Sequence, residues 1–259
     1  MQRILTILGL TLSLAVTVPL RAQNGSSNPS LPEAPFAPGE RMEYEVSYGV
    51  VPAGTMSLSI DDLVTYEGRP AYHILFDAET NRAASYVFQI DTHEESWLDA
   101  ERFHSLRYRK RSIEEGERRV RDYRFDQRRH LRIEPDGETK PASENAVDQL
   151  SFIYFLRQLP LEPRMKIVLT NQADPDDNPV VVRVRKRERI KVPAGSFETL
   201  VLDMEVKTDS GVFKKGGENR IWVTDDDRKV PVRISSKMGL GSFRAQLVEY
   251  DRGTPIASR

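Results

Sequence analysis

Apolar and polar residues alternate along most of this chain with a period of two, which is the pattern of β-strands that bury one face. Residues 42–48 and 56–60 both show it, and Pro52-Ala53-Gly54 between them predicts a hairpin turn. A second hairpin turn is predicted at Pro193-Ala194-Gly195. Further strands are predicted near residues 72–76, 90–97, 106–108, 119–125, 130–133, 166–170, 180–192, 197–207, 220–223, 230–235 and 243–250.

One segment has helical spacing instead. Apolar residues between 147 and 155 recur every three or four positions, Asn145 or Ser143 can cap the segment, and Pro160 ends it. We therefore predict a helix over about residues 145–158, and no more than a helical turn over 83–88. Strands do not alternate with helices, which excludes a doubly wound fold. The chain should be mainly β: a large antiparallel twisted sheet, a sandwich or an open β-barrel of ten or more strands, with one α-helix.

The N-terminus predicts export. A basic start at Met1–Arg3 precedes 17 residues, 4–20, that are almost all apolar or hydroxylated, and Leu20-Arg21-Ala22 suits signal peptidase. We predict a signal peptide (1–22) cut after Ala22, and a periplasmic mature chain without a transmembrane segment. The alternative is a membrane anchor, because the apolar run lies at the short end of the lengths that span a bilayer. Residues 23–38 predict a flexible leader, 39–252 a single β-rich domain and 253–259 a tail.

Composition and motifs exclude several function classes. The chain has no cysteine, so it has no disulfide framework, thiolate metal site or cysteine nucleophile. With 39 acidic and 38 basic residues, it lacks the net positive charge typical of nucleic-acid binding. Asp174–Asn178 begins like a calcium loop, but Pro179 and Arg185 occupy the positions that require glycine and glutamate. No catalytic residue, metal ligand or cofactor is predicted, and we expect a protein that is not an enzyme.

The charge is unevenly distributed. Residues 102–132 carry a net charge of +7 and residues 183–191 a net charge of +5, so the rest of the chain is strongly acidic. Strict alternation would place the arginines of each strand on one face, and neighbouring strands would then form a basic strip suited to phosphate or carboxylate groups. The alternative is a solvated face balanced by acidic residues. The predicted anion-binding residues are Arg107, Arg109, Arg183, Arg185, Arg187 and Arg189.

Several short motifs resemble one family. They are Pro38-Gly39-Glu40 near the start, Asp148-Gln149-Leu150-Ser151 in the helical segment, Val192–Phe197 at a turn, and Ile221-Trp222-Val223 near the end. Together they resemble the bacterial exported family called domain of unknown function 3108, over about residues 39–250. The resemblance implies an exported, barrel-like β domain, and it implies no reaction, cofactor or catalytic residue.

Two functions follow as hypotheses. In the first, an exported binding or envelope-assembly protein holds a lipid or another apolar small molecule inside a half-open barrel. The predicted lining residues are Tyr44, Met56, Leu58, Tyr72, Phe76 and Tyr154, which could equally fill a core. In the second, the arginine-rich face binds an anionic envelope component or an acidic partner protein.

Overall fold

A computed structural model describes residues 31–86, 89–114, 117–208, 213, 215–238 and 241–254. The predicted signal peptide (1–22) and the last five residues of the tail lie outside the described residues. The strands are β1 (Glu40–Tyr48), β2 (Val51–Tyr66), β3 (Arg69–Thr80), β4 (Ile90–Asp99), β5 (Ser105–Glu114), β6 (Glu117–Asp126), β7 (Leu131–Ile133), β8 (Thr139–Pro141), β9 (Lys166–Leu169), β10 (Val180–Val192), β11 (Gly195–Glu205), β12 (Glu218–Thr224), β13 (Pro231–Met238) and β14 (Gly241–Arg252). The helices are η1 (Ala84–Tyr86), α1 (Ser151–Gln158) and η2 (Pro175–Asp177).

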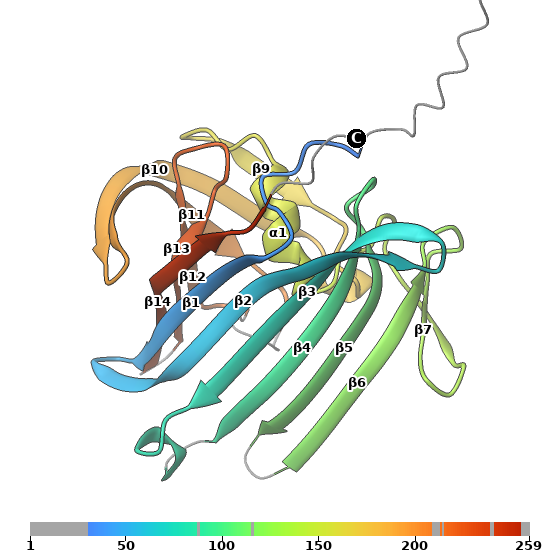
Figure 1. Ribbon diagram of the computed structural model, residues 1–259, viewed down its shortest axis with the longest axis horizontal. Coiled ribbons are helices and arrows are strands. Elements are labelled where there is room, and N and C mark those ends of the chain that lie inside the picture. The colour runs from blue at the N-terminus through green and yellow to red at the C-terminus, as the bar shows by residue number, and fades with distance from the viewer. Residues whose placement is uncertain are drawn as a thin grey trace, which may run out of the picture. The chain divides into compact units, whose positions relative to one another are not determined.

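All the strands that the structure describes belong to one antiparallel sheet of 14 strands, in the order β8-β7-β6-β5-β4-β3-β2-β1-β14-β13-β12-β11-β10-β9. The chain therefore starts at the middle of the sheet, winds to the β8 edge, crosses to the β9 edge and returns to the middle at β14. The sheet curls around α1 without closing (Figure 1). The prediction of a mainly β fold with ten or more antiparallel strands and one α-helix is confirmed.

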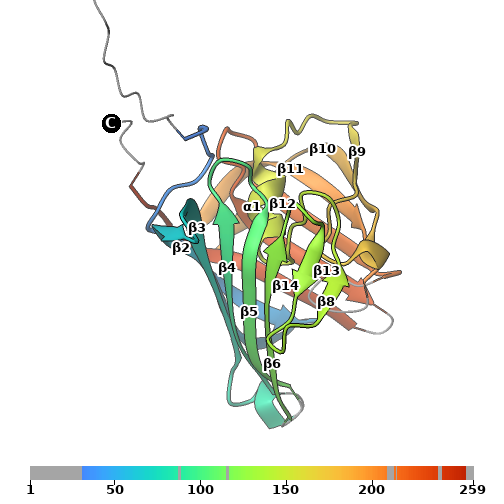
Figure 2. The ribbon, with the colours of Figure 1, turned by 90° about the vertical axis from the view of Figure 1, so that its right-hand side faces the viewer.

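The segment that crosses between the two edges contains α1, and the side view places this helix inside the curl of the sheet (Figure 2). Asp148 determines where the helix starts, because its carboxylate accepts hydrogen bonds from the backbone N–H groups of Leu150 and Ser151, both at 2.9 Å. The helix is shorter than the predicted 145–158, and neither Ser143 nor Asn145 caps it. Asn145 has a φ of 50° in a turn, which the helical pattern does not register. The helix ends before Leu159, which is extended as expected for a residue that precedes proline.

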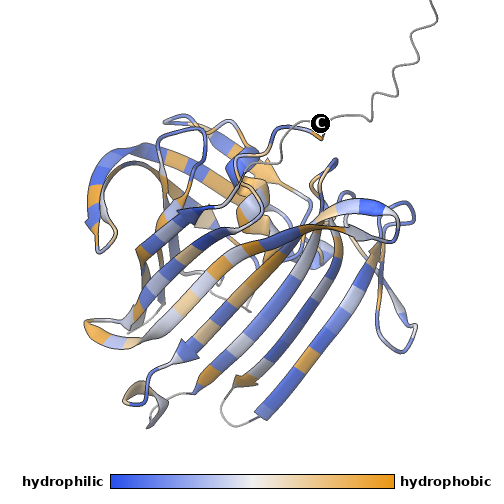
Figure 3. Ribbon diagram, viewed as in Figure 1, coloured by the Kyte–Doolittle hydropathy of each residue, from blue (hydrophilic) through white to orange (hydrophobic). Residues whose placement is uncertain are grey.

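Several strands bury alternate residues along much of their length, among them β1, β4 and β10, and the hydropathy colouring shows polar and apolar residues alternating along strands (Figure 3). Paired residues on neighbouring strands place their side chains on the same face of a sheet. Val184, Leu202 and Ile221 are therefore on the same face of the sheet as Ala245 and Val46, and this face surrounds α1. We call it the inner face and the opposite one the outer face.

The first hairpin turn is not where the sequence predicted it. The turn residues are Gly49 and Val50, and Pro52-Ala53-Gly54 lies within β2. Gly54 is needed for close packing instead, because a Cβ atom there would lie 2.0 Å from the carbonyl oxygen of Glu79 on β3. A sequence pattern cannot distinguish these two uses of glycine.

The segment before β1 is packed against the domain. Residues 31–38 were expected to belong to a flexible leader, but the compact unit begins at Leu31 and buries Phe36 and Ala37. The ring of Phe36 packs edge-on against Tyr72 and Tyr154, with centroid distances of 5.1 and 5.0 Å. The polar and proline-rich composition of this segment predicted flexibility, but the single aromatic residue Phe36 packs it against the core. No helix among the described residues is long and apolar enough to cross a membrane.

Candidate functional site

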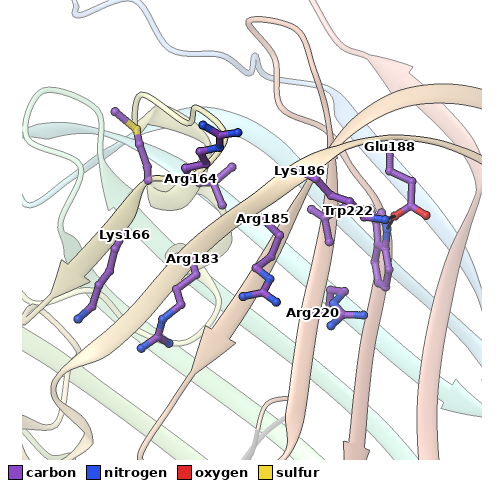
Figure 4. A pocket seen from close by; sticks show the side chains of 11 residues that line it. Arg164, Lys166, Arg183, Arg185, Lys186, Glu188, Arg220 and Trp222 are labelled. Atoms are coloured by element: carbon purple, nitrogen blue, oxygen red, sulfur yellow. Dashed lines mark hydrogen bonds and ion pairs between the residues drawn. The ribbon is translucent and has the colours of Figure 1, made fainter.

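A pocket with a volume of about 640 Å³ lies on the outer face of β9–β12. Strand register brings its polar side chains together. Lys166, Arg183, Asp203 and Arg220 are paired in turn across β9, β10, β11 and β12, so they form one row on this face. Lys166, Arg183 and Arg185 point to the same side of the pocket (Figure 4).

A β-bulge in β10 adds Arg185 to this row. The register shifts between Val184 and Lys186, which pair with the adjacent residues Leu202 and Val201. Arg185 is the extra residue, and its guanidinium lies 3.1 Å from the carboxylate of Asp203. The bulge therefore places one more cation beside the row without extending β11.

The same bulge corrects the prediction that four arginines of β10 share a face. Arg183 pairs with Asp203, but Arg187 pairs with Leu200, three residues away on β11, so the two arginines face opposite sides. Arg187 and Arg189 form ion pairs away from the pocket, with Asp225 at 2.6 Å and Glu198 at 3.7 Å. Only Arg183 and Arg185 of the predicted set line the pocket.

Cations outnumber carboxylates at the pocket. Six basic residues line it: Arg164, Lys166, Arg183, Arg185, Lys186 and Arg220. Three carboxylates neutralise part of this charge, because Asp203 pairs with Arg185 and Arg220, Glu205 with Arg183, and Glu188 with Lys186. Within the described residues, no ion pair involves Arg164 or Lys166. The pocket therefore has a local charge of about +3, on side chains exposed enough for their mutual ion pairs to be weak.

The bottom of the pocket is apolar. Val201 and Trp222 are buried there, and the indole N–H of Trp222 donates to Glu188 at 3.2 Å. Arg233 packs beside the same ring, 5.3 Å from its centroid, and both burial and the nearby Arg244 lower the pKa of Arg233. Trp222 and Val201 are thus almost fully covered, and the exposed apolar side chain at the pocket is that of Met165, which is 37% exposed.

The second predicted arginine set lies elsewhere. Eight strands separate β5 from β10, so the two sets do not form one strip. Arg107 is bound by both carboxylate oxygens of Asp122, at 2.9 and 2.7 Å, and this hydrogen bonding raises the pKa of Arg107. Arg109 lies 3.5 Å from Glu95. This region matches the alternative of a solvated face balanced by acidic residues.

The six residues predicted to line an apolar cavity are all part of the core around α1 or packed against it. Tyr44, Met56, Leu58, Tyr72 and Tyr154 are buried and Phe76 is partly buried. The hydroxyl of Tyr44 donates to the carbonyl of Pro231 at 2.7 Å, and Phe36 fills the space between Tyr72 and Tyr154. Whether any of them contacts a ligand stays a prediction.

The sequence analysis did not predict Arg164, Lys166, Arg220 or Trp222 as residues of a binding site. Arg220 and Trp222 lie two positions apart on β12 and so share its outer face, which the alternation of β12 could have indicated. Arg164 and Lys166 reach the pocket only because β9 pairs with β10. Strand pairing of this kind is not visible in a single sequence.

Comparisons with known proteins now place the chain in a family. The family profile described as "Protein of unknown function (DUF3108)" matches residues 43–248. The chain belongs to this family. The match covers β2 to β13 completely and most of β1 and β14, so the pocket lies within the residues that the family profile matches. Curated proteins yield no match.

Solved structures support the fold. A β-barrel-like protein of domain of unknown function DUF1849 from Brucella abortus superposes with a TM-score of 0.58 at 12% identity, over 85% of this chain and 99% of that one. Two other structures superpose less well. A presumed lipoprotein from Parabacteroides distasonis gives 0.30 at 9% identity over 84% of this chain and 98% of that one. A presumed exported protein with a YmcC-like fold from Bacteroides fragilis gives 0.32 at 12% identity over 86% and 99%.

Proposed function

We propose that this protein is a non-enzymatic binding protein that holds an anionic ligand in the pocket of β9–β12. The observation that carries the proposal is the row of Lys166, Arg183, Asp203 and Arg220 with Arg185 beside it, in which four cations flank one carboxylate next to the buried ring of Trp222. Guanidinium groups match the geometry of phosphate and carboxylate oxygens, and several of them converge here.

The N-terminal sequence supports a location outside the cytoplasm. In this proposal, residues 1–22 are a signal peptide cut after Ala22, and the mature protein works in the periplasm. Its ligand is then a phosphorylated or carboxylated component of the cell envelope, or an acidic segment of an envelope protein.

A second candidate is a lipid or other apolar molecule held inside the barrel. The half-open sheet favours it, but the space around Tyr72 and Tyr154 is filled by Phe36. Native mass spectrometry of protein purified from its own envelope tests this candidate directly. A bound lipid that stays after Arg183 and Arg185 are reversed in charge would favour the interior over the outer pocket.

Calorimetric titration with two probes tests the main proposal. Inorganic phosphate supplies the anion alone, and phenyl phosphate adds a ring that can pack on the exposed side chain of Met165. We expect phenyl phosphate to bind more tightly, and both affinities to fall as salt rises from low to physiological concentration, because the cations are exposed. Absence of binding by either probe at low salt would contradict the proposal.

The β-bulge in β10 places Arg187 and Arg189 away from the pocket, so these two arginines serve as a matched control for Arg183 and Arg185. The double variant Arg183→Glu with Arg185→Glu should weaken phenyl phosphate binding at least tenfold, since it changes the pocket charge by about four units. The double variant Arg187→Glu with Arg189→Glu makes the same charge change two residues away, on the inner face of the same strand. It should retain most of the affinity. Equal losses in the two variants would indicate a general charge effect and not a site.

A further inference from the structure

A cluster of exposed apolar side chains lies at one end of the barrel. Of the nine large apolar side chains exposed among the described residues, five lie in the β1–β2 turn, in the β3–β4 connection or at the strand ends that flank them. We call these five the apolar rim: Tyr48, Val50, Val51, Tyr86 and Ile90. Val50 is 96% exposed and Tyr86 is 80% exposed. Isolated exposed apolar residues are ordinary, but a cluster at two neighbouring loops marks an interaction surface.

Hydrogen bonds hold the two loops together. Asn81, just before η1, donates from its side chain to the carbonyl of Pro52 at 2.9 Å and from its backbone to the carbonyl of Ala53 at 2.9 Å. The N–H of Gly49 donates to the carbonyl of Ser242 at 2.7 Å, which fixes the β1–β2 turn against β14. The β1–β2 turn and η1 lie at the same end of the sheet in Figure 1. The apolar rim is therefore held in place by hydrogen bonds between the two loops and to β14.

Charged residues are sparse in these loops, although they make up 30% of the chain. Residues 47–60 contain no Asp, Glu, Lys or Arg, and residues 80–90 contain only Arg82, which is exposed. A chain with 39 acidic residues thus keeps all of them out of both loops. The one charge present has the sign that anionic lipid head groups attract.

The shape and chemistry of the rim fit a bilayer surface better than a flat protein partner. Val50 occupies the apex of a tight turn and projects into solvent, so it can enter the acyl region without a complementary pocket. Tyr48 and Tyr86 have the amphipathic rings that are enriched at the level of lipid head groups. Five shallow apolar side chains and one arginine are typical of peripheral and reversible membrane contact.

We propose that the apolar rim inserts into the surface of a lipid bilayer that contains anionic lipids. This contact is independent of the pocket of β9–β12, since it uses other strands and a different type of side chain. It would bring the domain to a membrane with the β1–β2 turn and η1 against the lipid.

Flotation of the full-length mature protein with vesicles tests the proposal. We expect the protein to float with vesicles of phosphatidylethanolamine and phosphatidylglycerol, and to float less with phosphatidylcholine alone. Val50→Asp should lower the partition coefficient about tenfold or more, because one buried valine contributes about 1.5 kcal/mol or more to insertion. Arg82→Glu should reduce the preference for phosphatidylglycerol. A wild-type protein that floats with neither kind of vesicle would overturn the proposal.

The chain offers a matched control in Val168 on β9, which is 52% exposed and remote from the rim in the sheet order. Val168→Asp should float like the wild type, and so should the variant with Arg183→Glu and Arg185→Glu. Equal losses for Val50→Asp and Val168→Asp would overturn the assignment to the rim. Sedimentation without vesicles tests the other occupant, a second copy of the chain: self-association that Val50→Asp abolishes, together with no flotation of the wild type, would replace the lipid proposal.

Discussion

Asp148 is a carboxyl group in the interior that joins the helix to the sheet. It is fully buried, and besides capping α1 it accepts a hydrogen bond from the hydroxyl of Ser96 at 2.6 Å, while its backbone N–H donates to the hydroxyl of Ser105 at 2.8 Å. Burial raises the pKa of Asp148, and the hydrogen bonds from Ser105, Ser96 and the helix N-terminus offset only part of this rise. Ionisation of the Asp148 carboxyl group therefore lowers the stability of the folded state.

We predict that Asp148→Ala destabilises the domain by about 2–4 kcal/mol, because it leaves two helix N–H groups and a serine hydroxyl without an acceptor. Asp148→Asn keeps an acceptor oxygen and should cost less. Chemical denaturation measures both. Asp126 accepts from the N–H groups of Arg128 and Arg129 in the same way but near the surface, so Asp126→Ala is the control and should cost about 1 kcal/mol or less.

The sign of the pH dependence follows from the raised pKa. The folded state binds the Asp148 proton more tightly than the unfolded state, where the pKa is near 3.8. The wild type should therefore lose stability relative to Asp148→Asn as pH rises from about 3.8 through the higher folded-state value. A difference between the two unfolding free energies that stays constant with pH would show that Asp148 is not the titrating group.

At the scale of the elements, β2 and β3 pack closely at a single glycine. Gly54 pairs with Thr80, and a Cβ atom at Gly54 would lie within 3.0 Å of three backbone atoms of β3. Gly49, in the preceding turn, has a left-handed φ of 61° but nothing within 4 Å of its Cβ position. Gly54 is needed because a side chain would clash with β3, whereas Gly49 is needed because its backbone is left-handed.

We predict that the two glycines differ in how much stability an alanine costs. Gly54→Ala should destabilise the domain by about 3 kcal/mol or more, because backbone atoms cannot move aside without breaking strand pairing. Gly49→Ala should cost only about 1–2 kcal/mol, the usual penalty of a left-handed residue with a side chain. Thermal or denaturant unfolding of the two variants compares them directly. A larger loss at Gly49 would indicate that β2 and β3 are less closely packed than described.

The elements also show what a single sequence can and cannot predict. Period-two alternation located most of the long strands, but the predicted strands stopped about six residues before the C-terminal ends of β2 and β5. It could not locate the bulge at Arg185, since an extra residue changes the face of every later side chain without changing composition. For the same reason Arg183 and Arg185 reach the pocket while Arg187 and Arg189 do not. The pairing of β9 with β10 depends on the whole topology and leaves no local signal.

At the scale of the whole molecule, one ion pair joins segments from distant parts of the chain. Arg157 of α1 and Glu40 at the start of β1 are both fully buried and share two hydrogen bonds of 2.5 and 2.9 Å. Arg157 also donates to the carbonyls of Pro35 and Arg228, and Tyr250 of β14 donates to Glu40 at 3.2 Å. Burial lowers the pKa of Arg157, but Glu40 outweighs burial and leaves the pKa raised.

Because the N-terminal strands and the C-terminal strands of the sheet meet where β1 pairs with β14, the Arg157–Glu40 ion pair anchors α1 to that junction. Arg157→Met or Glu40→Met alone should cost about 3–5 kcal/mol, since each leaves a buried charge without its partner. The double variant should cost clearly less than the sum, because it removes both charges. Denaturant unfolding of the four proteins forms the required cycle. Additive losses would mean that the two residues stabilise the fold separately, and that α1 is held by its apolar contacts with Phe36 and the inner face of the sheet.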